Sequence, residues 1–232
     1  MKTRGISIFL CILLMGILWI PSFGDEISSG DAPTGGMDRD HEINAWIQGL
    51  QDVSSDDWFY PILPGIYDLM KGVSDTEFAP NQPMTRAMFA TIVYRLDGEP
   101  GEGSSAGLFA DVPSGQWYSD AVNWAATFGI VKGVGDSRFD PNANVTREQM
   151  VTFLHRYTSY KGYPMSASLL PVDLFDDLDM ISEFAINSMP WAIGEGLIKG
   201  VGEKHLDPKG TATRAQVAQL MYNYIMSREV WD

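Results

Sequence analysis

The sequence predicts an all-α-dominated fold made of three copies of one helix–loop–helix unit. A segment running from a Lys-Gly pair to a Thr-Arg pair occurs three times without a gap, and such internal repetition indicates a repeat architecture. After each Thr-Arg pair, apolar residues fall at the spacing of one face of an α-helix. The composition is globular, because 45% of the 232 residues are apolar and 12% are aromatic.

Residues 1–24 are expected to be a secretory signal peptide. Lys2 and Arg4 precede an uncharged run whose centre, Ile6–Ile20, is apolar and is followed by Pro21. The run is near the lower length limit for a membrane-spanning helix, so an uncleaved anchor is the alternative. After cleavage the chain would have lost its only cysteine, Cys11, and would depend on its core for stability. We expect no membrane association after cleavage.

The mature chain is strongly acidic. Loss of Lys2 and Arg4 lowers the formal charge from −14 by two units to −16. A chain of this charge has no general attraction to nucleic acid or to an anionic membrane surface. An anionic partner therefore has to be held by a local cluster of basic residues.

Composition and repetition divide the rest of the chain. Asp25–Asp40 is rich in Gly, Ser and Asp and is expected to be disordered. The linker after the first repeat is Gly-rich and flexible, whereas the connector after the second is more apolar and is expected to pack. The segments expected in chain order are a polar leader at 25–48, repeats at 49–96, 108–160 and 174–232, the linker at 97–107 and the connector at 161–173.

The repeated segment spans 71–86, 132–147 and 199–214. In each copy an apolar residue follows the glycine by six positions and a proline follows it by eight. Upstream, each copy has an apolar-x-Asp start and an aromatic residue about six positions later. The aspartates are Asp52, Asp111 and Asp177, and the aromatic residues are Trp58, Trp117 and Phe184.

The second helix of each unit is expected to begin after a threonine N-cap. Thr85, Thr146 and Thr213 occupy this position, where the hydroxyl accepts an otherwise unsatisfied backbone N–H. Gln149 and Gln216 complete a capping box in the second and third copies, whereas the first copy has Met88 and should have the weakest cap. The first helix of the first copy contains Pro61 and Pro64, which disfavour a helix interior.

This pattern resembles the S-layer homology family, and the three copies cover nearly all of the mature chain. The resemblance implies a pseudo-threefold bundle in which one helix per repeat meets at the axis, with short extended loops and with grooves between neighbouring repeats. It also implies that the grooves bind secondary polysaccharides of the bacterial cell wall, commonly through a pyruvylated sugar. The expected function is therefore noncovalent anchoring at the bacterial cell surface, and the groove that depends on the proline-containing first helix is expected to be impaired.

The family's Thr-Arg-Ala-Glu signature implies an arginine that pairs with the ligand carboxylate. Arg86, Arg147 and Arg214 match it, although Met88, Gln149 and Gln216 replace the final Glu. Independently of the resemblance, free N–H groups at a helix N-terminus together with a guanidinium favour a carboxylate site. The full set of candidate ligand-binding residues is Arg86, Arg147, Arg214, Asp52, Asp111, Asp177, Trp58, Trp117, Lys132 and Lys199, with Lys71 at the same repeat position as the two lysines.

Structural roles for these residues remain open alternatives. Each arginine could form a salt bridge to Asp52, Asp111 or Asp177, and the aromatic residues could be core anchors. A second alternative for the function is a protein-interaction or surface-layer assembly module that binds other surface-layer proteins and no glycan.

We expect no enzymatic activity, cofactor or metal. His41, His155 and His205 are not placed beside a nucleophile, and no phosphate loop or metal-spaced histidine pair is present. Asp173, Asp176, Asp177 and Asp179 are expected to form a solvated acidic turn, with weak calcium binding as the alternative.

Overall fold

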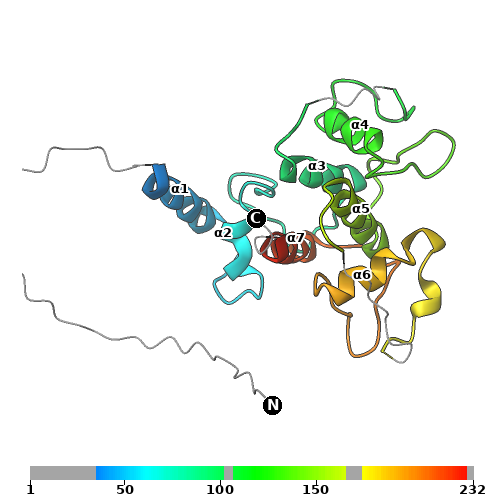
Figure 1. Ribbon diagram of the computed structural model, residues 1–232. Coiled ribbons are helices and arrows are strands. Elements are labelled where there is room, and N and C mark those ends of the chain that lie inside the picture. The colour runs from blue at the N-terminus through cyan, green and yellow to red at the C-terminus, as the bar shows by residue number, and fades with distance from the viewer. Residues whose placement is uncertain (1–34, 102–106, 166–173, 229–232) are drawn as a thin grey trace, which may run out of the picture.

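The computed structural model describes residues 35–101, 107–165 and 174–228 (Figure 1). The expected signal peptide and residues 25–34 of the polar leader lie outside these ranges. The described helices are α1 (Gly35–Gly49), η1 (Tyr60–Ile62), α2 (Leu63–Ile66), α3 (Arg86–Leu96), α4 (Ser119–Thr127), α5 (Arg147–Tyr160), η2 (Leu178–Met180), η3 (Glu183–Ala185), α6 (Ser188–Gly194) and α7 (Arg214–Arg228). The all-α-dominated fold is confirmed, since the described ranges contain only isolated β-bridges besides helices.

Three inner helices, α3, α5 and α7, form the centre of a pseudo-threefold bundle. The extended residues before them are joined in a closed cycle of backbone hydrogen bonds. The N–H of Met84 donates to Ala212 O at 2.9 Å, the N–H of Val145 to Met84 O at 2.8 Å, and the N–H of Ala212 to Val145 O at 3.2 Å. Because each repeat donates to one neighbour and accepts from the other, the first and third repeats are also neighbours, which gives the bundle its threefold arrangement.

The inner helices begin at the predicted threonines. Thr85 Oγ1 accepts the N–H of Met88, and in the second copy Thr146 and Gln149 form a complete capping box. Thr213 and Gln216 bond reciprocally in the third copy. In the first copy Met88 has no side-chain acceptor to return a bond, so the capping box is incomplete there; its lower stability stays a prediction.

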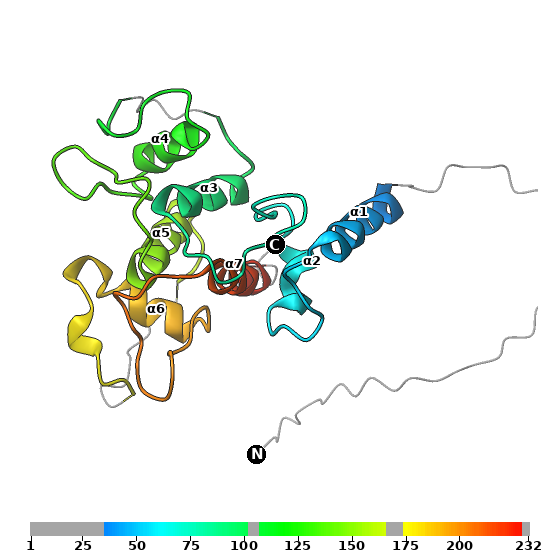
Figure 2. The ribbon, with the colours of Figure 1, turned by 180° about the vertical axis from the view of Figure 1, so that it is seen from behind.

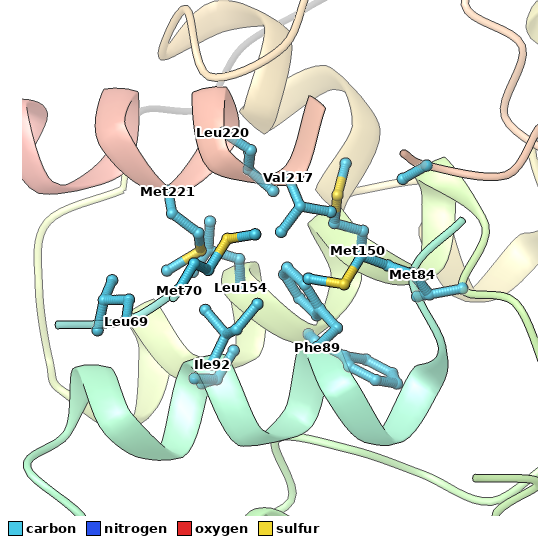
Figure 3. Close-up of a cluster of buried hydrophobic side chains, with 14 of the residues drawn as sticks. Leu69, Met70, Met84, Phe89, Ile92, Met150, Leu154, Val217, Leu220 and Met221 are labelled. Atoms are coloured by element: carbon cyan, nitrogen blue, oxygen red, sulfur yellow. The ribbon is translucent and has the colours of Figure 1, made fainter. Parts of the chain in front are cut away.

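Apolar side chains from the inner helices meet on the axis (Figure 3). Their spacing is that of the predicted helix face, and the core they form is closed to solvent. Burial of this apolar face determines which side of each inner helix points to the axis. The side chains include Phe89, Ile92, Met150, Leu154, Val217, Leu220 and Met221, each 3% exposed or less.

Each outer helix packs on the inner helix of the preceding repeat, as Figures 1 and 2 show from opposite sides. The helix α4 packs on α3, α6 packs on α5, and α2 packs on α7. The ring of Tyr94 on α3, for example, lies 5.5 Å from that of Trp124 on α4. The repeats are therefore interlocked, and the contact of α2 with α7 closes the ring.

The prolines of the first copy divide its outer helix. Pro61 lies in the first turn of η1 and Pro64 in the first turn of α2, so neither proline sits in a helix interior. The resulting short pieces still bury Ile62, Leu63 and Ile66. The irregularity predicted from the sequence is present, but the packing against α7 is retained.

Part of the leader that was expected to be disordered forms the helix α1. Residues 35–49, which overlap the leader at 25–48, form this helix and bury Ile43 and Ile47 on one face. Its Trp46 ring lies 5.1 Å from the ring of Tyr67. The apolar residues lie three and four positions apart, so the helix stays attached to the first repeat through a narrow stripe. None of the helices in the described ranges is long and apolar enough to span a bilayer.

Candidate functional site

The three repeated arginines each reach into the next repeat. Arg86 Nε donates to Phe139 O at 2.8 Å, Arg147 Nε to Leu206 O at 2.8 Å and Arg214 Nε to Phe78 O at 2.6 Å. The Nη2 atoms donate to the main-chain carbonyls of the repeated lysines. The acceptors are Lys132 O at 3.0 Å for Arg86, Lys199 O at 2.7 Å for Arg147 and Lys71 O at 2.7 Å for Arg214.

These guanidinium groups are buried without a carboxylate partner. Arg86, Arg147 and Arg214 are 3%, 5% and 6% exposed, and within the described ranges none forms an ion pair. Burial lowers the pKa of Arg86 to about 10, against the opposing attraction of Asp140 and Asp111. Burial likewise lowers the pKa of Arg147 and of Arg214. A buried cation of this kind has much to gain from an anionic ligand.

One nitrogen of each guanidinium remains available. Among the described residues Nη1 has no hydrogen-bond acceptor, and it is not one of the unpaired atoms sealed from solvent. Carbonyl oxygens thus hold two nitrogens in a fixed orientation and leave the third for another acceptor. A guanidinium fixed in this way is pre-organised for a carboxylate.

The repeated aspartates hold the loop that the arginines bind. Asp111 accepts the N–H of Phe139 and of Asp140, both at 2.8 Å, and Asp52 and Asp177 make the matching pairs in their own repeats. Burial disfavours the ionised Asp111, but these N–H bonds outweigh it and lower its pKa. The suggested Arg–Asp salt bridges are therefore wrong: a peptide unit lies between the two side chains, donating to the aspartate and accepting from the arginine.

The helix N-termini do not offer free N–H groups to an anion. The N–H of Arg86 donates to Ala143 O, and the N–H of Ala87 donates to Pro141 O. Equivalent bonds join α5 to Gly210 and Pro208, and α7 to Gln82 and Pro80. We expected a carboxylate site made of free N–H groups and a guanidinium. The N–H part of this expectation is wrong, because carbonyl groups of the neighbouring repeat already accept those N–H groups.

Among the described residues, two open grooves bring motif residues of different repeats together. The first, of about 430 Å³, is lined by residues of all three repeats and is named here the Trp117 groove. Residues that follow the proline-containing α2 line this groove, so the irregular first helix does not close it; impaired binding there stays a prediction. Its polar and aromatic lining includes Lys71, Gly72, Arg95, Glu99, Trp117 and Arg214.

The second groove, of about 540 Å³, is the threefold equivalent and is named here the Trp58 groove. Its lining includes Trp58, Arg147, Lys199, Gly200, Gln216 and Asn223. In both grooves the lysine and inner helix come from one repeat, the arginine from the repeat before it and the tryptophan from the repeat after it. Sequence-distant residues of the same motif are thus brought together only across repeat boundaries.

The two tryptophans are not core anchors. Trp58 is 60% exposed and Trp117 is 61% exposed, and each lines its groove with an indole that is open to solvent. The glycine after each lysine is required because other atoms pass too close to it for a side chain. A Cβ at Gly200 would lie 2.8 Å from both His205 O and the Phe175 ring, which excludes any side chain at this position.

The remaining candidates lie elsewhere. Arg86, Lys132 and the 49% exposed Phe184 line neither groove, and neither do Asp52, Asp111 and Asp177. Within the described ranges, no three His, Cys, Asp or Glu side chains are placed to hold a metal ion.

The groove-lining residues on the second face of the inner helices were not predicted as binding residues from the sequence. Met88, Thr91 and Arg95 line the Trp117 groove, and the residues at the same repeat positions line the Trp58 groove. The latter residues are Gln216, Gln219 and Asn223. Their spacing of three and four positions was available in the sequence, as a second stripe beside the apolar face of each inner helix.

Comparison with known proteins gives one family. The S-layer homology domain matches residues 67–90, 108–151 and 174–218. The chain is 34% identical over 161 residues to an amylopullulanase from Thermoanaerobacterium thermosulfurigenes, covering 68% of this chain and 8% of that protein. It is 32% identical over 229 residues to an endoglucanase from Bacillus sp. (strain KSM-635), covering 94% and 22%.

A surface-layer protein gives a further match. The chain is 26% identical over 174 residues to the S-layer protein sap of Bacillus anthracis, covering 73% of this chain and 20% of that protein. The chain therefore spans less than a quarter of the length of each of these relatives.

Proposed function

The chain belongs to the S-layer homology domain family, and from this premise we propose that its three repeats hold it noncovalently on the bacterial cell wall. The proposed ligand is a secondary wall polysaccharide that carries an acidic substituent, with the carboxylate of a pyruvylated sugar as the group bound. The proposed role is non-catalytic, since the alignments with the two carbohydrate-active relatives cover only 8% and 22% of those proteins.

One observation supports the proposal most strongly. In two grooves a guanidinium without a carboxylate partner, a lysine and an exposed tryptophan from three different repeats line one open space. The guanidinium and lysine suit a carboxylate, and an indole face suits the apolar face of a sugar ring. In a chain with a formal charge of −14, such a local cluster is where an anionic ligand is favoured.

Two grooves on one interlocked body would also increase retention on the wall. When one groove is occupied, the second meets the same polysaccharide at a high effective concentration. Individually weak sites therefore give lasting attachment, provided that the glycan can reach both grooves.

The proposal is tested by sedimentation of the full chain with purified cell-wall sacculi, before and after extraction of their acidic polysaccharide. We expect binding to the intact sacculi and its loss after extraction. Trp58→Ala should weaken binding by at least about tenfold, as removal of a central interface tryptophan commonly does. Phe128→Ala is the matched control, because Phe128 is an exposed aromatic residue that lines neither groove.

A second pair of variants separates ligand contact from structural support. Arg147 and Arg86 make the same two kinds of main-chain hydrogen bond, but of the pair only Arg147 lines one of the two described grooves. Arg147→Lys and Arg86→Lys should therefore lower stability to urea by similar amounts, while only Arg147→Lys weakens binding to sacculi. Equal binding by the two variants, or binding that survives extraction of the polysaccharide, would favour the protein-interaction alternative.

A further inference from the structure

The two grooves share their lysine, arginine and tryptophan but differ in the side chains supplied by the inner helix. Helix α3 supplies Met88, Thr91 and Arg95 to the Trp117 groove. At the same repeat positions, α7 supplies Gln216, Gln219 and Asn223 to the Trp58 groove. Because the lysine, arginine and tryptophan are shared, these three positions are one source of the chemical difference between the grooves.

The charges of the two linings are unequal. The described residues that line the Trp58 groove include two basic side chains, Arg147 and Lys199, and no carboxylate. The Trp117 groove adds a third cation, Arg95, together with the carboxylates of Asp68 and Glu99. Glu99 Oε1 lies 3.6 Å from Arg95 Nε, so the additional cation is largely compensated. An anionic ligand therefore meets a repulsive carboxylate only in the Trp117 groove.

The hydrogen-bonding groups also differ. In the Trp58 groove Gln219 Nε2 donates to Asn223 Oδ1 at 2.7 Å, and Asn223 Nδ2 donates to Leu197 O at 3.2 Å. These two hydrogen bonds fix the orientation of the Gln219 amide. Among the described residues, no donor binds its Oε1. In the Trp117 groove the corresponding Thr91 is 7% exposed and its hydroxyl donates to Ala87 O at 3.0 Å. A sugar hydroxyl therefore finds an oriented amide acceptor in one groove only.

We propose that the two grooves are not interchangeable and that the Trp58 groove is the principal site for a singly charged acidic sugar. In this groove Gln219 accepts a hydrogen bond from a sugar hydroxyl. In the Trp117 groove the carboxylate of Glu99 weakens binding of the acidic sugar. This inference rests on the proposed function, because it assigns different roles to the two sites that the function requires. It predicts affinities that differ within one chain.

The test uses methionine methyl NMR, since the grooves contain their own reporters. Met88 lines the Trp117 groove and Met150 lines the Trp58 groove. The full chain, labelled at its methionine methyl groups, is titrated with a methyl hexopyranoside carrying a 4,6-pyruvate ketal. The matched neutral probe is the 4,6-isopropylidene ketal, which replaces the carboxylate by a methyl group.

The expected result is that Met150 saturates at a ligand concentration about fivefold lower than Met88, the factor for one surface charge interaction. The difference should narrow with the neutral ketal, because only the Gln219 contact then favours the Trp58 groove. Glu99→Gln should strengthen binding of the acidic ketal in the Trp117 groove, reported by Met88, by a similar factor. The titration reported by Met150 should not change. Glu77→Gln, an exposed glutamate outside both grooves, is the control and should change neither reporter.

The role of Gln219 is tested by Gln219→Thr, which installs the residue found at this position in the first repeat. We expect weaker binding at Met150 for the ketal with free 2- and 3-hydroxyl groups, and no change for its 2,3-di-O-methyl derivative. Equal affinities at both methionines, or an unaltered titration of Glu99→Gln, would overturn the inference while leaving the proposed function intact. If neither methionine signal shifted on addition of the acidic ketal, both the inference and the proposed function would be overturned.

Discussion

The aspartate that holds each loop provides a quantitative test of how the repeats are connected. Asp177 Oδ1 accepts the N–H of Leu206 at 2.9 Å, and Oδ2 accepts the N–H of Asp207 at 2.8 Å. Asp207 has a φ of 49°, a left-handed conformation that the loop must maintain. The same loop presents Leu206 O to Arg147, so its position also determines that of the guanidinium in the Trp58 groove.

The substitution Asp177→Asn retains one acceptor oxygen and turns an NH₂ group toward the second N–H. A hydrogen bond to a charged group contributes about 1.5 to 3 kcal/mol, so the loss of one bond and of the charge on the other predicts a cost of about 3 kcal/mol at pH 7. Urea unfolding followed by tryptophan fluorescence measures this free energy. Asp176→Asn, at the exposed neighbouring position, is the control and should change stability by less than about 0.5 kcal/mol.

The pH dependence of the same variant gives an independent check. Burial disfavours ionisation of Asp177, but the N–H bonds from Leu206 and Asp207 outweigh it and lower its pKa below the usual 3.8 of an aspartate. Its stabilising contribution is therefore present above the unfolded-state pKa and is lost as the pH falls through the lower folded-state pKa. The stability gap between the parent chain and Asp177→Asn should narrow below about pH 4. A gap smaller than about 1 kcal/mol at neutral pH, or one that stays constant into acid, would refute this account of the loop.

Three further perturbations test separate parts of the fold. Gly133→Ala places a Cβ 2.5 Å from Arg138 O and should cost more than about 2 kcal/mol in urea unfolding, whereas Gly49→Ala, whose Cβ would meet only Asp75 O at 3.8 Å, should be neutral or stabilising. Thr146→Ala removes the N-cap of α5 and should cost about 1 kcal/mol, measured as a lower urea midpoint; an unchanged midpoint would contradict the capping role. Burial, followed by the charge of Arg156, lowers the pKa of His155, so its contribution to stability is present above its unfolded pKa of 6.5 and lost as the pH falls below it. His155→Tyr, the residue found at this register in the other repeats, should therefore reduce the loss of stability between pH 7.5 and 5, and an identical pH profile would argue against this role.

The features within one repeat were predictable because they depend on neighbouring residues. The N-cap threonines, the capping boxes with Gln149 and Gln216 and the apolar stripe of each inner helix are set by interactions within one or two helical turns. The exception was α1, where a polar composition hid a narrow apolar stripe that contains Ile43 and Ile47. Composition averaged over the leader was a poorer guide than spacing.

The environment of the arginines could not be predicted in the same way. The motif places Arg147 beside Thr146, and local reasoning then assigns it free N–H groups and an aspartate partner. In the structure Pro208 O and Gly210 O take those N–H groups, and Leu206 O and Lys199 O take the guanidinium. All four acceptors belong to a repeat about sixty positions away, and no pattern within one copy encodes that distance.

The sequence by itself determined that this protein is three helical units with a cation, an aromatic residue and a carboxylate at fixed positions in each, because short-range periodicity and capping act within a unit. Only the tertiary structure decided which copies share a groove and that Arg147 and Arg214 line open grooves while Asp111 and Asp177 hold loops. The physical reason is that each groove is built where surfaces of three repeats meet, and burial of the apolar faces of α3, α5 and α7 is what brings those surfaces together.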